Sequence, residues 1–238
     1  MYIIISVVLM SLLLFGMIVD YISTIKERNI HIRNQKIAKY VKSIVNGQRL
    51  LERRTALPVT MQCSIISLER SLRAFEKLIK LQSSQSRLEA MAAINAKLNS
   101  FKKSSPSPKN HYALLQVPSS KNEQVNMLKQ CVRLKFFLKA EYDKGNISSE
   151  ILQSETVPLE ILNARLKAAI ISAQAVEELG HQDYTKLQKL SDKAMQFLHD
   201  IQYDDNKVKA LLAQEIEKIK LINVNIIDKT EEKIEEST

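Results

Sequence analysis

Residues 2–19 contain no charged side chain, and this stretch constrains the rest of the chain more than any other feature. As a helix with a rise of about 1.5 Å per residue, it would be roughly 27 Å long, close to the thickness of the hydrocarbon core of a bilayer. A cleaved signal peptide would need a basic start and small residues at a cleavage site, and neither is present. A core helix that is apolar on every side would need partners all round it, which a mostly amphipathic chain does not offer. The stretch therefore predicts a transmembrane anchor over residues 1–20, with membrane lipid around residues 2–19.

The charges that follow the anchor predict its orientation. Residues 21–60 carry nine basic and two acidic side chains, so +7 of the net charge of +9 lies in this segment. Lys and Arg favour the cytoplasmic side of a membrane helix, and those near the membrane also attract anionic lipid. We therefore expect a single-pass protein of the cell (inner) membrane, with its N-terminus outside and its C-terminal domain cytoplasmic. The nearly balanced charge beyond residue 60 argues against nucleic acid as a partner.

Residues 21–57 are predicted to form a long basic amphipathic stalk helix. Apolar residues recur at helical spacing on one face, basic residues occupy the opposite face, and Gly47 is expected to weaken the helix locally. The apolar face has three candidate partners: the chain's own bundle, a second copy in a coiled coil, or lipid. The candidate packing stripe is Ile30, Ile37, Val41, Ile44 and Leu51. The candidate basic face, towards lipid or a partner, is Arg28, Lys36, Lys39, Lys42, Arg49 and Arg53.

The rest of the chain predicts helices. Four glycines, five prolines and 5% aromatic residues suit an all-α fold better than a sheet. Apolar spacing predicts an αα-hairpin over residues 58–101, and the Ser- and Pro-rich residues 102–120 predict a linker. Residues 121–238 are expected to form a helical bundle, in which Pro158 opens a hairpin over residues 158–202 and a long helix ends the chain. If that hairpin repeats residues 58–101, the domain is either one bundle or a short stack of αα-hairpins.

Two further expectations concern the start of the bundle. Residues 113–117 offer a short apolar patch for docking within the linker, and Ser120 with Glu123 resembles a capping box that opens the next helix. The apolar positions predicted for that helix are Val125, Leu128, Val132, Phe136 and Leu138.

The sequence offers no recognisable set of catalytic residues. Four glycines cannot supply a phosphate-binding loop, and no serine lies in a nucleophile elbow. Cys63 and Cys131 are isolated on predicted helices, and the four histidines form no metal-binding pair at helical spacing. We therefore expect two buried thiols, and no catalytic residue, metal ion or cofactor.

These features predict a non-catalytic membrane protein whose cytoplasmic helical domain binds an unidentified protein as an interaction or scaffold module. Two alternatives stay open. In the first, the basic stalk binds anionic lipid or nucleic acid. In the second, the chain is a sensor whose helices pass a signal along the stalk, which predicts a homo-oligomer.

Overall fold

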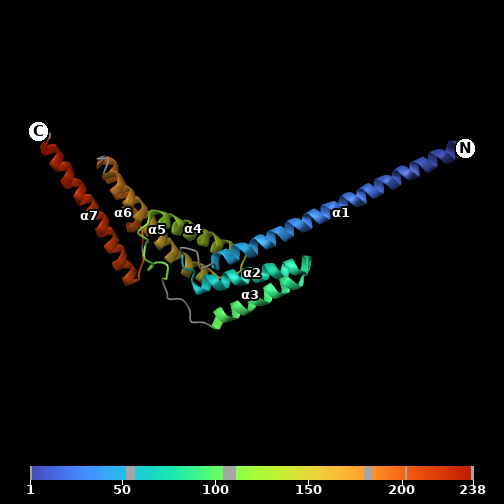
Figure 1. Cartoon of the computed structure of the whole chain (residues 1–238), viewed down its shortest axis with the longest axis horizontal. Coiled ribbons are helices and arrows are strands. Elements are labelled where there is room, and N and C mark those ends of the chain that lie inside the picture. The colour runs from blue at the N-terminus through green and yellow to red at the C-terminus, as the bar shows by residue number, and fades with distance from the viewer. Residues whose placement is uncertain (1, 52–56, 104–110, 180–183, 202, 237–238) are drawn as a thin grey trace. The chain divides into compact units, whose positions relative to one another are not determined.

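The computed structural model describes residues 2–51, 57–103, 111–179, 184–201 and 203–236, without the side chains of residues 2–14, 178–179, 184 and 222–236. Every regular element in these ranges is an α-helix, which confirms the all-α fold class (Figure 1). The helices are α1 Tyr2–Leu51, α2 Met61–Leu81, α3 Gln85–Lys103, α4 Lys121–Tyr142, α5 Ser149–Leu179, α6 Tyr184–His199 and α7 Asn206–Glu236.

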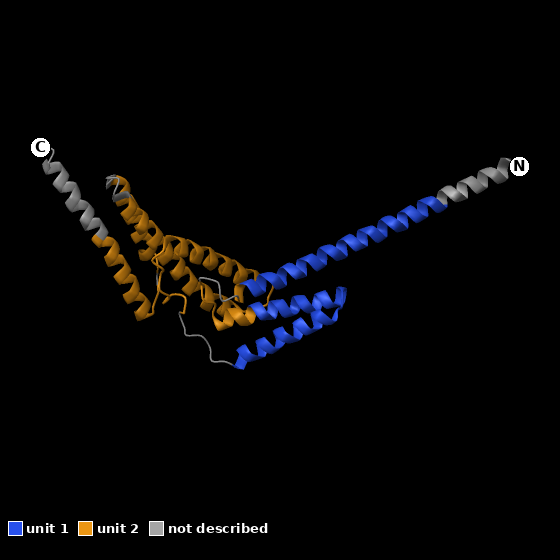
Figure 2. Cartoon of the chain, viewed as in Figure 1, with its two compact units in different colours: residues 1–49, 67–103 blue, residues 50–66, 104–238 orange. Residues whose placement is uncertain are grey.

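The chain divides into two compact units (Figure 2). Unit 1 consists of residues 1–49 and 67–103, and therefore of α1, most of α2, and α3. Unit 2 consists of residues 50–66 and 104–238, and therefore of the first turns of α2 together with α4 to α7. The hairpin predicted over residues 58–101 corresponds to α2 and α3, but α2 contributes to both units.

In unit 1, the predicted anchor and the predicted stalk belong to one unbroken helix, α1, which is about 75 Å long at a rise of 1.5 Å per residue. Its second half runs antiparallel to α2. Ser67 Oγ donates to the carbonyl oxygen of Gly47 at 2.8 Å, and Arg70 Nε donates to Ser43 Oγ at 3.1 Å. Arg33 Nη2 donates to the carbonyl oxygen of Leu81 at 2.6 Å. Residues 33–47 of α1 therefore lie alongside residues 67–81 of α2, and the two helices run in opposite directions.

Gly47 lets α1 and α2 approach closely, rather than simply weakening α1. A Cβ atom at this position would lie 2.5 Å from Ser71 Oγ and 3.3 Å from both the carbonyl oxygen and Oγ of Ser67. The facing side of α2 is made of small buried residues at helical spacing. These residues are Ser67, Ser71 and Ala74.

The substitution Gly47→Ala is therefore expected to lower the thermal stability of the α1–α2 pair. Overpacking a close contact costs about 1–3 kcal/mol, while replacing a helical glycine by alanine gains only about 1 kcal/mol. Gly16→Ala is the matched control, because a Cβ at Gly16 meets no atom within 4 Å. Circular dichroism during heating should show a lower midpoint for the first variant and not for the second. Equal midpoints for both variants would contradict the close approach.

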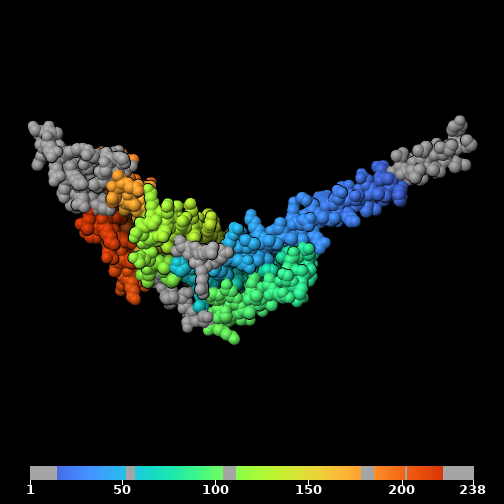
Figure 3. Space-filling model, viewed as in Figure 1, coloured from blue at the N-terminus to red at the C-terminus, as the bar shows by residue number. Residues whose placement is uncertain are grey.

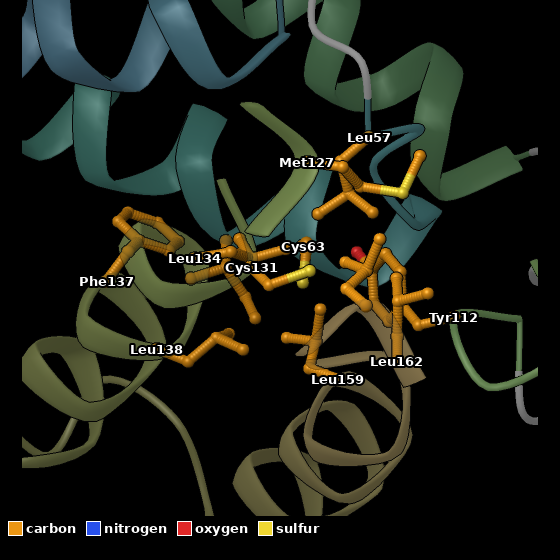
Figure 4. Close-up of a cluster of buried hydrophobic side chains, with 12 residues drawn as sticks. Leu57, Cys63, Tyr112, Met127, Cys131, Leu134, Phe137, Leu138, Leu159 and Leu162 are labelled. Carbon is orange, nitrogen blue, oxygen red and sulfur yellow. The ribbon is translucent and has the colours of Figure 1, made fainter. Parts of the chain in front are cut away.

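Two clusters of buried side chains form the core of unit 2, and α5 contributes to both. The first joins α4 and α5 to the beginning of α2 and to the segment around Tyr112 (Figure 4). The second joins α5 to α6 and α7. Within the first cluster lie Leu57, Cys63, Ile66, Tyr112, Met127, Cys131, Leu134, Phe137, Leu138, Leu159, Leu162 and Leu166.

Pro158 lies inside α5, so the prediction that it opens a helix is wrong. A proline inside a helix costs about 3 kcal/mol or more, because it removes one hydrogen bond and crowds the preceding turn. Leu159, Ile161 and Leu162 follow directly, and each is at most 3% exposed. Burying three such side chains contributes roughly 1.5–3 kcal/mol each, which outweighs the cost of the proline.

The prediction for α4 was wrong at two apolar positions. Val132 is 39% exposed and Phe136 is 69% exposed, whereas Gln124 and Glu141 are buried. Gln124 Nε2 donates to the carbonyl oxygen of Pro118, and the Glu141 carboxylate accepts from Asn146, whereas Gln124 Oε1 is buried without a hydrogen-bond partner among the described residues. Apolar spacing places only apolar residues in the core, so it cannot predict that Gln124 and Glu141 are buried while Val132 and Phe136 are exposed.

Ser120 is the N-cap residue of α4, but its side chain makes no capping hydrogen bond, so the capping box is absent. The segment before it does dock, because Tyr112 and Ala113 are almost fully buried.

In the described ranges, no helix combines the length and the hydropathy that crossing a membrane requires. The side chains of residues 2–14, which make up most of the predicted anchor over residues 1–20, lie outside those ranges. The anchor therefore stays a prediction.

Candidate functional site

The surface of α1 brings the predicted stalk residues and their neighbours into three groups. The first is the side that packs in the chain's own fold. Ile44 is buried, Ile37 and Leu51 are half-buried, and Ile30 and Val41 are exposed. The fold thus covers part of the predicted packing stripe and leaves Ile30 and Val41 open.

The second group is the predicted basic face. At about 100° per residue, most of its positions lie on the side of α1 turned away from Ile44 and Gly47, while Lys36 lies nearer to the packed side. No ion pair joins any of them to another residue of the described ranges, so they form a row of positive charge about 31 Å long from Arg28 to Arg49. The exposed members are Arg28, Lys36, Lys39, Lys42 and Arg49, and Arg53 lies outside the described residues.

The third group consists of exposed apolar side chains in residues 15–25 of α1, where the described side chains of this helix begin. We call this group the apolar collar. At about 100° per residue its positions spread over more than half of the circumference of the helix. In the space-filling view, α2 and α3 do not cover this dark blue part of α1 (Figure 3). The members are Phe15 (67% exposed), Met17 (70%), Ile18 (55%), Val19 (50%), Tyr21 (67%), Ile22 (58%) and Ile25 (41%).

The described part of unit 2 contains a buried group with the residue types of a reactive site. Glu155 Oε2 accepts from Thr60 Oγ1 at 2.8 Å and from the Cys63 thiol at 3.2 Å. The Tyr112 hydroxyl accepts from the backbone N–H of Thr60 at 2.9 Å. These contacts hold three parts of unit 2 together: the start of α2, α5, and the segment that precedes α4.

The ionisation of this group favours a structural role. Burial raises the pKa of the Cys63 thiol far above its ordinary value, and the Glu155 carboxylate raises it further. Burial likewise raises the pKa of Tyr112, and it raises the pKa of Cys131 to about 12. Both thiols are thus protonated at neutral pH, and a protonated thiol is a poor nucleophile. No local pattern signals this group, because its members come from three separate segments.

Both cysteines are buried and free, as expected. His31 contacts Gln35 on the surface of α1, the ring of His111 stands edge-on to Tyr112, and His199 ends α6. The fourth histidine, His181, lies outside the described residues. Across the described ranges, no three His, Cys, Asp or Glu side chains are grouped to hold a metal ion.

Arg165 forms a buried clamp in unit 2. Its Nε and Nη2 donate to the Glu215 carboxylate of α7, with the shortest contact at 2.7 Å. Its Nη1 donates to the carbonyl oxygens of Ala113 at 2.7 Å and Leu115 at 2.8 Å. The docked segment and α7 are therefore both held to α5. A basic residue between Leu162 and Leu166 was the available sequence signal for a buried ion pair.

Comparison with known proteins gives no relatives: no family model, no curated protein and no solved structure matches the chain.

Proposed function

We propose that the chain is a single-pass membrane protein whose cytoplasmic helices bind another protein. Residues 2–19 span the bilayer, the N-terminus is outside, and α2 to α7 form the cytoplasmic module. The observation that carries the proposal is the apolar collar, which continues the uncharged stretch of the sequence along the same unbroken helix.

A bilayer suits this collar because lipid covers a wide arc of a helix at once. Transfer of a large apolar side chain from water contributes roughly 1.5–3 kcal/mol, so leaving seven exposed is expensive. A single flat protein surface would cover only a narrower stripe of the circumference. Tyr21 within the collar also fits the interfacial position that tyrosine prefers in membrane proteins.

Distances along α1 separate the basic residues into those that reach lipid and those that do not. Lys26 and Arg28 lie about 9 and 12 Å beyond Asp20, comparable with the screening length of about 8 Å at physiological salt. Lys36 and Arg49 lie about 24 and 44 Å beyond it. If α1 leaves the bilayer steeply, residues 36–49 face the cytoplasm, which favours an acidic protein surface over lipid as their partner.

The proposal is tested by extraction and topology of the full chain. Membranes of expressing cells are washed with alkaline carbonate, and a reporter active only in the cytoplasm is fused to the C-terminus. We expect the chain to stay in the pellet and the reporter to be active. An inactive reporter on a chain that is in the pellet, or a chain found in the supernatant before any carbonate wash, would overturn the proposal. Release by carbonate alone would instead support lipid binding through the basic face.

A further inference from the structure

The exposed side of α4 combines apolar and basic residues in a way that the fold of unit 2 does not use. Val132 and Phe136 are one turn apart and are 39% and 69% exposed. Lys129, Arg133 and Lys139 each lie three residues from one of them, on the same side of the helix. We call these five residues the α4 outer face. The buried side of α4, with Met127, Cys131 and Leu134, is turned away from it.

We infer that the α4 outer face binds the surface of an anionic bilayer. Its three cations make no ion pair with another described residue, in contrast to Lys135, which pairs with Glu160 of α5. Of the acidic residues of α4, Glu123 lies beyond one end of the face, and Glu141 near the other end is buried, where its carboxylate accepts from Lys144 and Asn146. The face therefore presents uncompensated positive charge around two protruding apolar side chains. This combination is typical of interfacial helices, which insert apolar side chains between headgroups while Lys and Arg contact anionic lipid.

The exposure of Phe136 favours lipid over a peptide as the partner. A helical or extended peptide is usually held in a groove or along a sheet edge, where its anchor residues become enclosed. Phe136 instead projects from the outer side of a single helix, which suits insertion into a soft, flat surface. The inference rests on the proposed function in one respect: the anchor tethers the chain to the bilayer, which raises the effective concentration of lipid for unit 2, and the α4 outer face is occupied when α1 does not leave the bilayer steeply.

The test uses the absence of tryptophan from the chain. Phe136→Trp places a single fluorophore on the α4 outer face of the full chain, which is reconstituted in vesicles of phosphatidylcholine, with or without phosphatidylserine. We expect the emission to shift to shorter wavelength, and to be quenched by brominated acyl chains, only when phosphatidylserine is present. Val176→Trp is the matched control, because Val176 is 55% exposed in the same unit but lies next to Glu177. Its emission should not respond to phosphatidylserine.

Neutralising the three cations of the α4 outer face is the second part of the test. In the Phe136→Trp background, Lys129→Gln, Arg133→Gln and Lys139→Gln together should abolish the shift. Each cation near an anionic surface contributes roughly fivefold in binding, so the ratio of bound to free face should fall roughly a hundredfold. Circular dichroism checks that the variant stays helical. A shift that survives this change, or that appears equally in pure phosphatidylcholine, overturns the inference.

Contact with a second copy and failure of the anchor would each give a different result. A shift that depends on protein concentration instead of phosphatidylserine would assign the face to a second copy, and it would also overturn the inference. Carbonate extraction of the same vesicles reports on the anchor alone. Failure of the anchor would release the whole chain, whereas failure of the α4 outer face would leave the chain in the pellet with the introduced indole exposed to water.

Discussion

Placing two lysines at the middle of the uncharged stretch, Met10→Lys with Leu13→Lys, is expected to abolish stable membrane association of the chain. A lysine at the centre of a spanning helix costs about 2.5–3.5 kcal/mol, so two together cost roughly 5–7 kcal/mol. A span of only eighteen residues has little reserve against such a penalty. The measurement is the fraction of chain in the carbonate-resistant pellet, with full-length protein in both fractions detected by a C-terminal tag.

The matched control places the same charges on the same helix beyond the predicted span. Ile30 and Val41 are 49% and 41% exposed, so Ile30→Lys with Val41→Lys should leave both the fold and the membrane fraction unchanged. If the Met10 and Leu13 variant stays in the pellet as well as this control does, residues 2–19 do not act as a transmembrane anchor.

Removing the Arg165 guanidinium is expected to have the largest effect on folding. Arg165→Met would leave the Ala113 carbonyl oxygen buried without this donor and the Glu215 carboxylate without its cation. Removing one partner of a buried ion pair costs about 3–5 kcal/mol, and because the Glu215 side chain is 22% exposed the loss is expected at the lower end of this range. Since each kcal/mol lowers the unfolding midpoint of a domain of this size by about 2–4 °C, we expect a loss on the order of 10 °C by circular dichroism in mild detergent.

Two variants sharpen this prediction. Glu215→Gln keeps a hydrogen-bond acceptor opposite Arg165 and should cost less than Arg165→Met. Lys135→Met removes an exposed ion pair with Glu160, and exposed pairs contribute at most about 1 kcal/mol. A midpoint for Arg165→Met no lower than that for Lys135→Met would show that the clamp does not stabilise unit 2.

The fold class was accessible from the sequence, because scarce glycine and proline and apolar residues three or four apart constrain local structure strongly. The apolar spacing that predicted the hairpin over residues 58–101 corresponds to helices α2 and α3, and Leu68 and Phe75 of α2 are buried. Local periodicity contains this information, since a helix repeats every 3.6 residues whatever it packs against.

The errors arose where tertiary contacts outweigh local preference. Pro158 is accommodated because the residues after it are buried, and Gly47 is required by the serines of another helix. Phe136 is exposed, whereas Gln124 and Glu141 are buried and bond to Pro118 and Asn146, which lie just outside the two ends of α4. The same limit applies to the candidate sites: the basic row of α1 could be predicted from spacing, whereas the α4 outer face emerges only when burial is known.

The continuity of α1 between Tyr2 and Leu51 makes it a lever. With its first turns fixed in a bilayer, a tilt of about 10° would displace Gly47, about 40 Å beyond Asp20, sideways by about 7 Å. Because Gly47 packs closely against Ser67 and Ser71, the same displacement would move α2 as well. A thinner or thicker membrane, which changes the tilt of a spanning helix, would thereby move the contact between α1 and α2.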